Sequence, residues 1–129
     1  MHKSRLGTVV IDCQPDDIDT SASFWSAALG WATEESSDSD DPNYRLLVGP
    51  PDQVKVLVQK VAHPSRVHID IETDDLEAEA RRLEKLGARR VAFVKRWWVM
   101  EAPTGQRFCI VNPQRPDFAQ RAKVWSDQD

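Results

Sequence analysis

Three polar side chains alternate with aliphatic ones in the second half of the chain, where His68, Asp70 and Glu72 are separated by Ile69 and Ile71. Alternate side chains of a β-strand share one face, so the histidine and both carboxylates are expected on the same face, with neighbours about 7 Å apart. A neighbouring carboxylate favours the protonated imidazole, which makes His68 and Asp70 candidates for acid–base catalysis and Glu72 a candidate for ligand binding. The alternative is a row of polar residues that hydrogen-bond one another or water and do no chemistry. The opposite face, expected to meet a helix, carries Val67, Ile69 and Ile71.

Two adjacent tryptophans and an arginine are further candidates for ligand binding. In a strand, the rings of Trp97 and Trp98 would point to opposite faces, and either ring could form one wall of a small-molecule pocket. Alternation alone does not decide which ring does so, and a place in the core is the alternative for both. Arg45 could bind the carboxylate or phosphate of a ligand, or remain solvated.

The elements that must position these residues occur twice in the chain. Each half contains an apolar strand, a pair of aspartates and an amphipathic helix that ends in Leu-Gly, and the two copies are offset by 57 or 58 residues. Two modules that each bury one face must pack against other surfaces, and a space between two paired sheets can hold a ligand. The paired segments are 9–12 with 67–70, Asp16-Asp17 with Asp74-Asp75, and Leu29-Gly30 with Leu86-Gly87.

Periodicity and turn residues predict the remaining elements. Each module reads as a strand, a helix and two or three further strands, with boundaries at about 5–62 and 66–113. The acidic run from Glu34 to Asp41 is predicted to be a solvated loop, and Phe118, Ala122 and Trp125 predict a tail helix at about 116–126. The expected strands are 6–13, 44–48, 54–61, 91–94, 97–101 and 107–111. The first expected helix is 18–29, which has helically spaced apolar residues at Phe24, Trp25, Ala28 and Leu29. The second is 76–86, with an inward stripe of Leu76, Ala80, Leu83 and Leu86.

Length and composition favour one domain over residues 1–129 and exclude several partners. With 40% hydrophobic residues the chain can build one core, and its net charge of −4 with scattered basic residues argues against a nucleic-acid partner. No run of 18 apolar residues exists, so no membrane partner is expected, and the start of the chain does not resemble a signal peptide. The two cysteines form no CxxC pair and are expected to be reduced, which favours a cytoplasmic protein.

The order of the motifs in the second module carries a family resemblance. The stretches concerned are 67–71, Asp74-Asp75-Leu76, Leu86-Gly87-Ala88 and 98–111. Together they resemble the vicinal oxygen chelate superfamily, and its glyoxalase-like subgroup in particular, which includes glyoxalase I, bleomycin resistance proteins and extradiol dioxygenases. This resemblance implies an α+β fold of two βαβββ modules that form curved mixed sheets around a cavity, often in a dimer.

The resemblance also identifies where a metal would bind. Metal-containing members take one ligand from the first and one from the last strand of each module, which corresponds here to Val10, a position near Leu57, His68 and Cys109. Only His68 is a good ligand, and a catalytic metal needs about three, so we expect no metal and no cofactor. The sequence therefore predicts a homodimeric glyoxalase-like protein that binds a small organic molecule, with Cys109 near the ligand and possible acid–base chemistry at His68. The alternatives are a metal-dependent lyase, isomerase or dioxygenase with atypical ligands, and a module that serves only in assembly.

Overall fold

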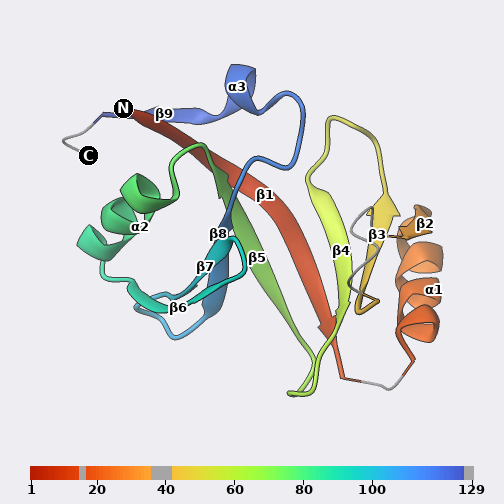
Figure 1. Ribbon diagram of the computed structural model, residues 1–129. Helices are drawn as coiled ribbons and strands as arrows, with labels where there is room; N and C mark the ends of the chain where they lie inside the picture. The colour runs from red at the N-terminus through yellow and green to blue at the C-terminus, as the bar shows by residue number, and fades with distance from the viewer. Residues whose placement is uncertain (15–16, 36–41, 127–129) are drawn as a thin grey trace. The chain divides into compact units, whose positions relative to one another are not determined.

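The computed structural model describes residues 1–14, 17–35 and 42–126. They form two compact units (Figure 1). The N-terminal unit is Thr8–His68, and the C-terminal unit combines Met1–Gly7 with the described residues from Ile69 onward. Strands β1 (His2–Cys13) and β5 (Arg66–Thr73) run through the division, so each contributes residues to both units.

The N-terminal unit is a βαβββ module. After β1 come helix α1 (Ile18–Leu29) and strands β2 (Ala32–Glu35), β3 (Tyr44–Val48) and β4 (Lys55–Lys60). The strand order is β2-β3-β4-β1, and β1 is parallel to β4 while the other pairs are antiparallel. Helix α1 packs on β2, β3 and β4. The core of this unit consists of Ile11, Cys13, Leu47, Val56 and Val58, with Ile18, Trp25 and Trp31 packed against it.

Helix α1 confirms the predicted boundaries, but not all of its regularly spaced apolar residues face the core. Asp17 caps its N-terminus by accepting a hydrogen bond from the backbone N–H of Asp19, and Gly30 ends it in the left-handed conformation with φ 72°. Trp25 packs on the core as expected, whereas Phe24 is 62% exposed and Leu29 is 43% exposed. Helical spacing gave the correct period but not which side of the helix meets the sheet.

Strand β2 corrects the prediction that a solvated loop begins at Glu34. Residues Ala32–Glu35 pair antiparallel with β3, with Ala32 opposite Val48 and Glu35 opposite Arg45. The hydrogen bonds to β3 satisfy the backbone N–H and C=O groups of this segment, so it forms a strand although glutamate is uncommon in strands. The rest of that predicted loop, residues 36–41, lies outside the described residues, as does Asp16 of the first aspartate pair.

The C-terminal unit repeats the βαβββ module. Strand β5 leads into α2 (Leu76–Lys85), β6 (Arg89–Val94), β7 (Trp97–Glu101) and β8 (Arg107–Val111), with the strand order β5-β8-β7-β6. Helix α2 covers one face of β6, β7 and β8 (Figure 1). Two βαβββ modules in one chain confirm the predicted α+β fold class. The core of this unit consists of Ala80, Leu83, Met100, Phe108 and Ile110, with Ile71, Leu76 and Trp98 among the residues packed against it.

Two details of this unit correct the sequence analysis. Leu86, predicted on the inward stripe of α2, is 66% exposed because the helix ends at Lys85 and Leu86 forms its C-cap. The tail is not one helix: α3 covers only Phe118–Arg121, and β9 (Lys123–Trp125) then pairs antiparallel with His2–Ser4 of β1. Ala122 is extended, and the backbone of His2–Ser4 supplies the hydrogen bonds that turn the following residues into a strand.

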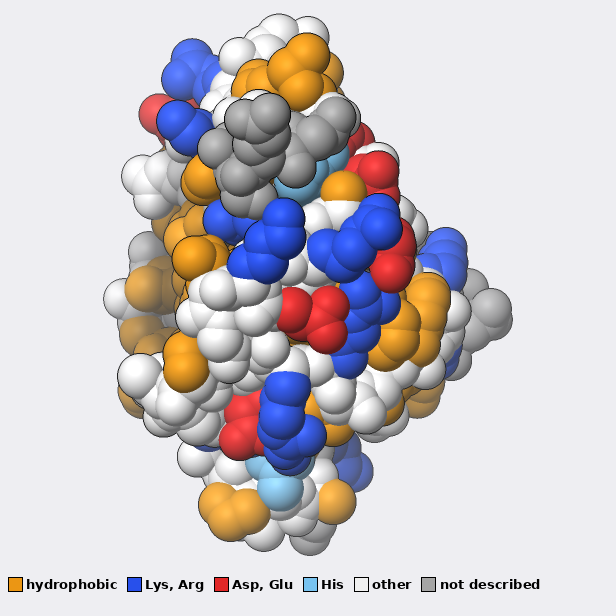
Figure 2. Space-filling model, turned by 90° about the vertical axis from the view of Figure 1, so that its left-hand side faces the viewer, with side chains coloured by type: hydrophobic (Ala, Val, Ile, Leu, Met, Phe, Trp, Pro, Cys, Tyr) orange, Lys and Arg blue, Asp and Glu red, His pale blue; other side chains and the backbone are white. Residues whose placement is uncertain are grey.

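Charges of both signs are mixed on the face that carries α2 and β6. Figure 2 shows Lys and Arg side chains lying beside Asp and Glu side chains there, and Arg90 pairs with both Glu77 and Glu84. This surface is not a separate positive patch of the kind that binds nucleic acid. No helix in the described part of the chain is long and apolar enough to cross a membrane.

Candidate functional site

The pleat of the C-terminal unit decides which of the two tryptophans lies in the core. Trp98 is in register with Ile110, packs on the core under α2, and lies 5.1 Å from Phe93 between ring centroids. Trp97, one residue earlier, therefore belongs to the opposite face. That opposite face also carries a row of three residues in register across β5, β8 and β7, namely Asp70, Cys109 and Val99.

The imidazole of His68 has a buried carboxylate partner that sequence reasoning missed. Its Nδ1 lies 2.7 Å from Oδ2 of Asp12, and both residues belong to the N-terminal unit. The Asp12 side chain is only 1% exposed and that of His68 is 13% exposed. A carboxylate can only accept, so Nδ1 of His68 carries the hydrogen in this bond. We expected Asp70 as the acidic neighbour, and the structure gives Asp12 this direct bond.

The same carboxylate oxygen also accepts a hydrogen bond from an arginine. Nε of Arg66 lies 3.4 Å from Oδ2 of Asp12, and the Arg66 side chain is 46% exposed. Arg66 and His68 are two residues apart on β5 and hence share a face. The other oxygen of Asp12, Oδ1, is buried and has no hydrogen-bond partner among the described residues.

A polar row continues from Asp12 across the N-terminal unit. Asp12 is in register with Gln59 on β4, and Gln59 is in register with Tyr44 on β3. Nε2 of Gln59 donates to the Tyr44 hydroxyl at 3.0 Å. Because register partners share a face, these three side chains lie on the side of the sheet opposite Ile11 and Val58, the side that does not meet α1.

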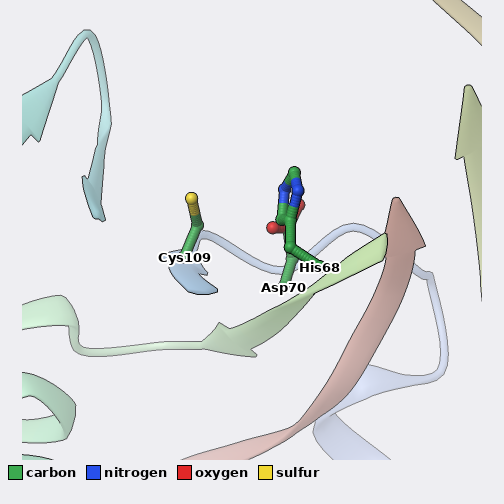
Figure 3. Close-up of side chains that lie close together, drawn as sticks. All are labelled: His68, Asp70 and Cys109. Atoms are coloured by element: carbon green, nitrogen blue, oxygen red, sulfur yellow. The ribbon is translucent and has the colours of Figure 1, made fainter. Parts of the chain in front are cut away.

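His68, Asp70 and Cys109 form the group of potential metal ligands that the described residues contain. One ligand atom from each side chain lies within 4.8 Å of the others. His68 and Asp70 project from β5 and Cys109 from the neighbouring β8, and all three point the same way (Figure 3). Neither Cys13 nor Cys109 forms a disulfide; Cys13 is buried, whereas Cys109 is partly exposed.

Two other predicted site residues, Glu72 and Arg45, have charged partners elsewhere in their own units. Glu72 is fully buried, accepts a hydrogen bond from Nε of Arg5 at 2.6 Å, and also accepts one from the backbone N–H of Gln114 at 2.9 Å. Arg45 pairs with Asp19 at 3.1 Å and donates to the carbonyl oxygens of residues 42 and 44. Glu72 and Arg45 therefore each have a charged partner of their own, Arg5 and Asp19.

The prediction that the aliphatic residues of β5 all meet a helix is wrong for two of them. Ile71 packs on the core under α2, but Val67 is 60% exposed and Ile69 is 41% exposed. The alternation is right, but α2 packs on β6, β7 and β8 and reaches only the part of β5 at Ile71.

Comparison with known proteins identifies the family. A family model described as a glyoxalase-like domain matches residues 8–111. The chain belongs to this family. No curated protein sequence matches this glyoxalase-like chain significantly.

Solved structures share the fold of this glyoxalase-like chain at low sequence identity. Methylmalonyl-CoA epimerase from Mycobacterium tuberculosis is 21% identical with a TM-score of 0.61, and the match covers 90% of this chain and 91% of that one. A glyoxalase/bleomycin resistance protein/dioxygenase superfamily member from Vibrio splendidus is 20% identical with a TM-score of 0.51, over 83% and 98% of the two chains. A Streptomyces coelicolor methylmalonyl-CoA epimerase variant in complex with 2-nitronate-propionyl-CoA is 14% identical with a TM-score of 0.56, over 84% and 98%. At these identities the likeness shows the fold alone.

The register changes the expected set of metal ligands. Asp70 pairs with Cys109 and Asp12 pairs with Gln59, so the counterpart of Cys109 in the N-terminal unit is Gln59 and not Leu57. Val10, the counterpart of His68, is 1% exposed and has no donor atom. Val10 therefore removes one of the four ligand positions that the resemblance implied.

Proposed function

We propose that the protein binds a small organic molecule on the sheet face that carries His68, and that His68 moves a proton to or from this molecule. The observation that carries the proposal is the 2.7 Å hydrogen bond between Nδ1 of His68 and the buried carboxylate of Asp12. A base whose orientation is fixed by a third group is the usual arrangement for proton transfer by histidine.

Asp12 would act by fixing and stabilising the imidazole. It holds the hydrogen on Nδ1, so that Nε2 can accept a proton from a carbon next to a carbonyl group of the ligand. The C–H bond breaks, an N–H bond forms, and the electron pair moves into the carbonyl group. The imidazolium that results is stabilised by the Asp12 carboxylate, and the proton can return to the same or the other face of the carbon.

The named relatives support this reaction class as a proposal. Two of the similar structures are described as methylmalonyl-CoA epimerases, one of them in complex with 2-nitronate-propionyl-CoA. Epimerisation beside a carbonyl group requires removal and return of a proton, which is the chemistry that a fixed imidazole performs. Methylmalonyl-CoA is therefore the first substrate to test.

The experiment measures incorporation of solvent deuterium into methylmalonyl-CoA by mass spectrometry. We expect His68→Gln to lower the exchange rate by about 100-fold or more, since general acid–base catalysis contributes about 10²–10⁴. Asp12→Asn should also lower it, because an amide can hold the wrong tautomer. His63→Gln is the matched control. His63 belongs to the same unit and is exposed, and its Nδ1 lies 2.8 Å from the carbonyl oxygen of Pro64. A wild-type rate in His68→Gln would contradict the proposal.

We propose further that this chemistry needs no resident metal, because an imidazole held by Asp12 can move the proton itself and Val10 removes one of the four implied ligand positions. The grouping of His68, Asp70 and Cys109 favours a second candidate, a metal-dependent lyase, isomerase or dioxygenase with atypical ligands. Three nitrogen, oxygen and sulfur donors are the number that a catalytic zinc site uses. Elemental analysis and Co²⁺ titration distinguish the two. A stoichiometric metal, with a thiolate-to-cobalt absorption band lost in Cys109→Ser, would replace the metal-free proposal with the second candidate.

The organisation of the protein completes the proposal. We propose a single cytoplasmic domain over residues 1–129 that forms a homodimer. Cysteines that form no disulfide are consistent with a reducing compartment, and exposed Phe24 and Phe93 are apolar side chains that a second subunit could cover. Light scattering coupled to size-exclusion chromatography tests the dimer, and a single cooperative unfolding transition in calorimetry tests the single domain.

A further inference from the structure

We infer that the molecule bound beside His68 is an organic anion whose carboxylate is held by Arg66. The inference rests on the proposed function, because it takes the ligand to lie next to the imidazole. It adds a substrate class, small carboxylic acids, and a residue that selects for them.

Arg66 and His68 are fixed side by side by one buried oxygen. Oδ2 of Asp12 accepts from Nδ1 of His68 at 2.7 Å and from Nε of Arg66 at 3.4 Å. The bond from Arg66 uses Nε, which leaves the terminal N–H donors of the guanidinium group for another acceptor. These donors form a planar fork that matches the two oxygens of a carboxylate.

Burial separates the role of Asp12 from that of Arg66. Asp12 is 1% exposed, so it serves as an internal anchor, while the Arg66 side chain is 46% exposed and can meet a ligand that arrives from solvent. The second oxygen of Asp12 has no hydrogen-bond partner among the described residues, whereas the first accepts from both Arg66 and His68. A carboxylate on the ligand would place a second anion against the same guanidinium group.

The charges favour an anion at the moment of proton transfer. With a neutral imidazole, Arg66 and Asp12 balance each other. Once His68 has taken the proton, the three side chains carry a net charge of about +1, which stabilises the negative charge that develops on the ligand. A carboxylate next to the reacting carbon would remain on Arg66 throughout, so it would also position that carbon at Nε2 of His68.

The test measures binding by isothermal titration calorimetry with methylmalonate, with its neutral diamide and with inorganic phosphate. We expect methylmalonate to bind the wild-type protein and Arg66→Gln to weaken it about tenfold or more, the value of a charge-assisted hydrogen bond. Arg66→Lys should weaken it less, because the charge remains while the fork is lost. Arg121→Gln, whose side chain is 76% exposed on α3, is the control and should bind like wild type.

Three results would overturn the inference: unchanged methylmalonate affinity in Arg66→Gln, diamide binding as tight as that of methylmalonate, or phosphate binding that is equally tight and equally dependent on Arg66. Thermal unfolding of Arg66→Gln shows whether the variant is folded, and Arg66→Lys keeps the test valid if it is not. The inference and the proposed function fail separately. If deuterium exchange depends on His68 but binding does not depend on Arg66, only the inference is wrong. If binding depends on Arg66 but no exchange occurs, only the proton-transfer proposal is wrong.

Discussion

Replacing Glu79 by glutamine should destabilise the protein, even though this residue lies in none of the proposed sites. Glu79 is on α2, its side chain is fully buried, and it accepts hydrogen bonds from Arg82 at 2.8 and 2.7 Å and from Nε2 of His2 at 2.7 Å. Removing one partner of a buried ion pair costs about 3–5 kcal/mol. Glutamine keeps the shape and one acceptor, so we expect a loss of about 2–4 kcal/mol in the free energy of unfolding.

The loss should depend on pH in a defined direction. Burial tends to raise the pKa of Glu79, but the hydrogen bonds from Arg82, His2 and Ser4 outweigh it and hold the pKa below its ordinary value of 4.5. A carboxyl group whose pKa is lower in the folded than in the unfolded state stabilises the protein fully above its unfolded pKa. That contribution disappears as the pH falls through the folded pKa. The gap between wild type and Glu79→Gln should therefore be widest near pH 7 and shrink below about pH 4.5.

Urea denaturation at a series of pH values measures both effects. Glu77→Gln is the matched control, because Glu77 lies on the same helix and pairs with Arg90 but its side chain is 54% exposed. Exposed pairs contribute at most about 1 kcal/mol. Equal losses in the two variants, or a gap for Glu79→Gln that stays constant down to pH 3, would refute the reasoning.

Three further predictions concern the two cores and the thiols. Met100→Ala, at a fully buried position, should lower the free energy of unfolding by about 2–5 kcal/mol in the same assay. Gly49→Ala should cost about 1–3 kcal/mol, seen as a lower melting temperature, because a Cβ at this position would lie 2.6 Å from the ring of Trp31. N-ethylmaleimide should label Cys109 before Cys13, which is 7% exposed; time-resolved mass spectrometry measures the order, and earlier labelling of Cys13 would contradict the prediction.

The regular elements could be predicted because their signals are local. An aspartate before α1 and α2 and a glycine after each helix fixed the helix ends to within a residue or two, and alternation placed Ile71 on the helix side of β5. Strands β2 and β9 could not be predicted in the same way. Each is short and takes its hydrogen bonds from a strand elsewhere in its unit, so pairing decides the conformation.

The candidate site was predictable only in part for the same reason. Alternation identified His68 as a candidate functional residue and put Asp70 on its face, but the carboxylate 2.7 Å from its Nδ1 belongs to Asp12, 56 residues away along the chain. The sequence around Arg66 did not identify it as a site residue either, because its place beside His68 depends on the bond that both make to Oδ2 of Asp12. Such a contact depends on which strands become neighbours, and no local pattern reports it.

The duplication itself did contain a signal for Asp12. At the offset of 58 residues that aligns the strands, Val10 corresponds to His68 and Asp12 corresponds to Asp70. The register agrees, because Asp12 pairs with Gln59 as Asp70 pairs with Cys109. Both copies therefore keep an acidic residue two positions after the place where a ligand is expected, while only the second keeps the histidine. The first copy has valine in place of the histidine but contains a fully buried carboxylate, and an isolated buried charge is costly. The hydrogen bond to His68 gives this carboxylate a partner, and it is the reason that Asp12→Asn should affect proton transfer.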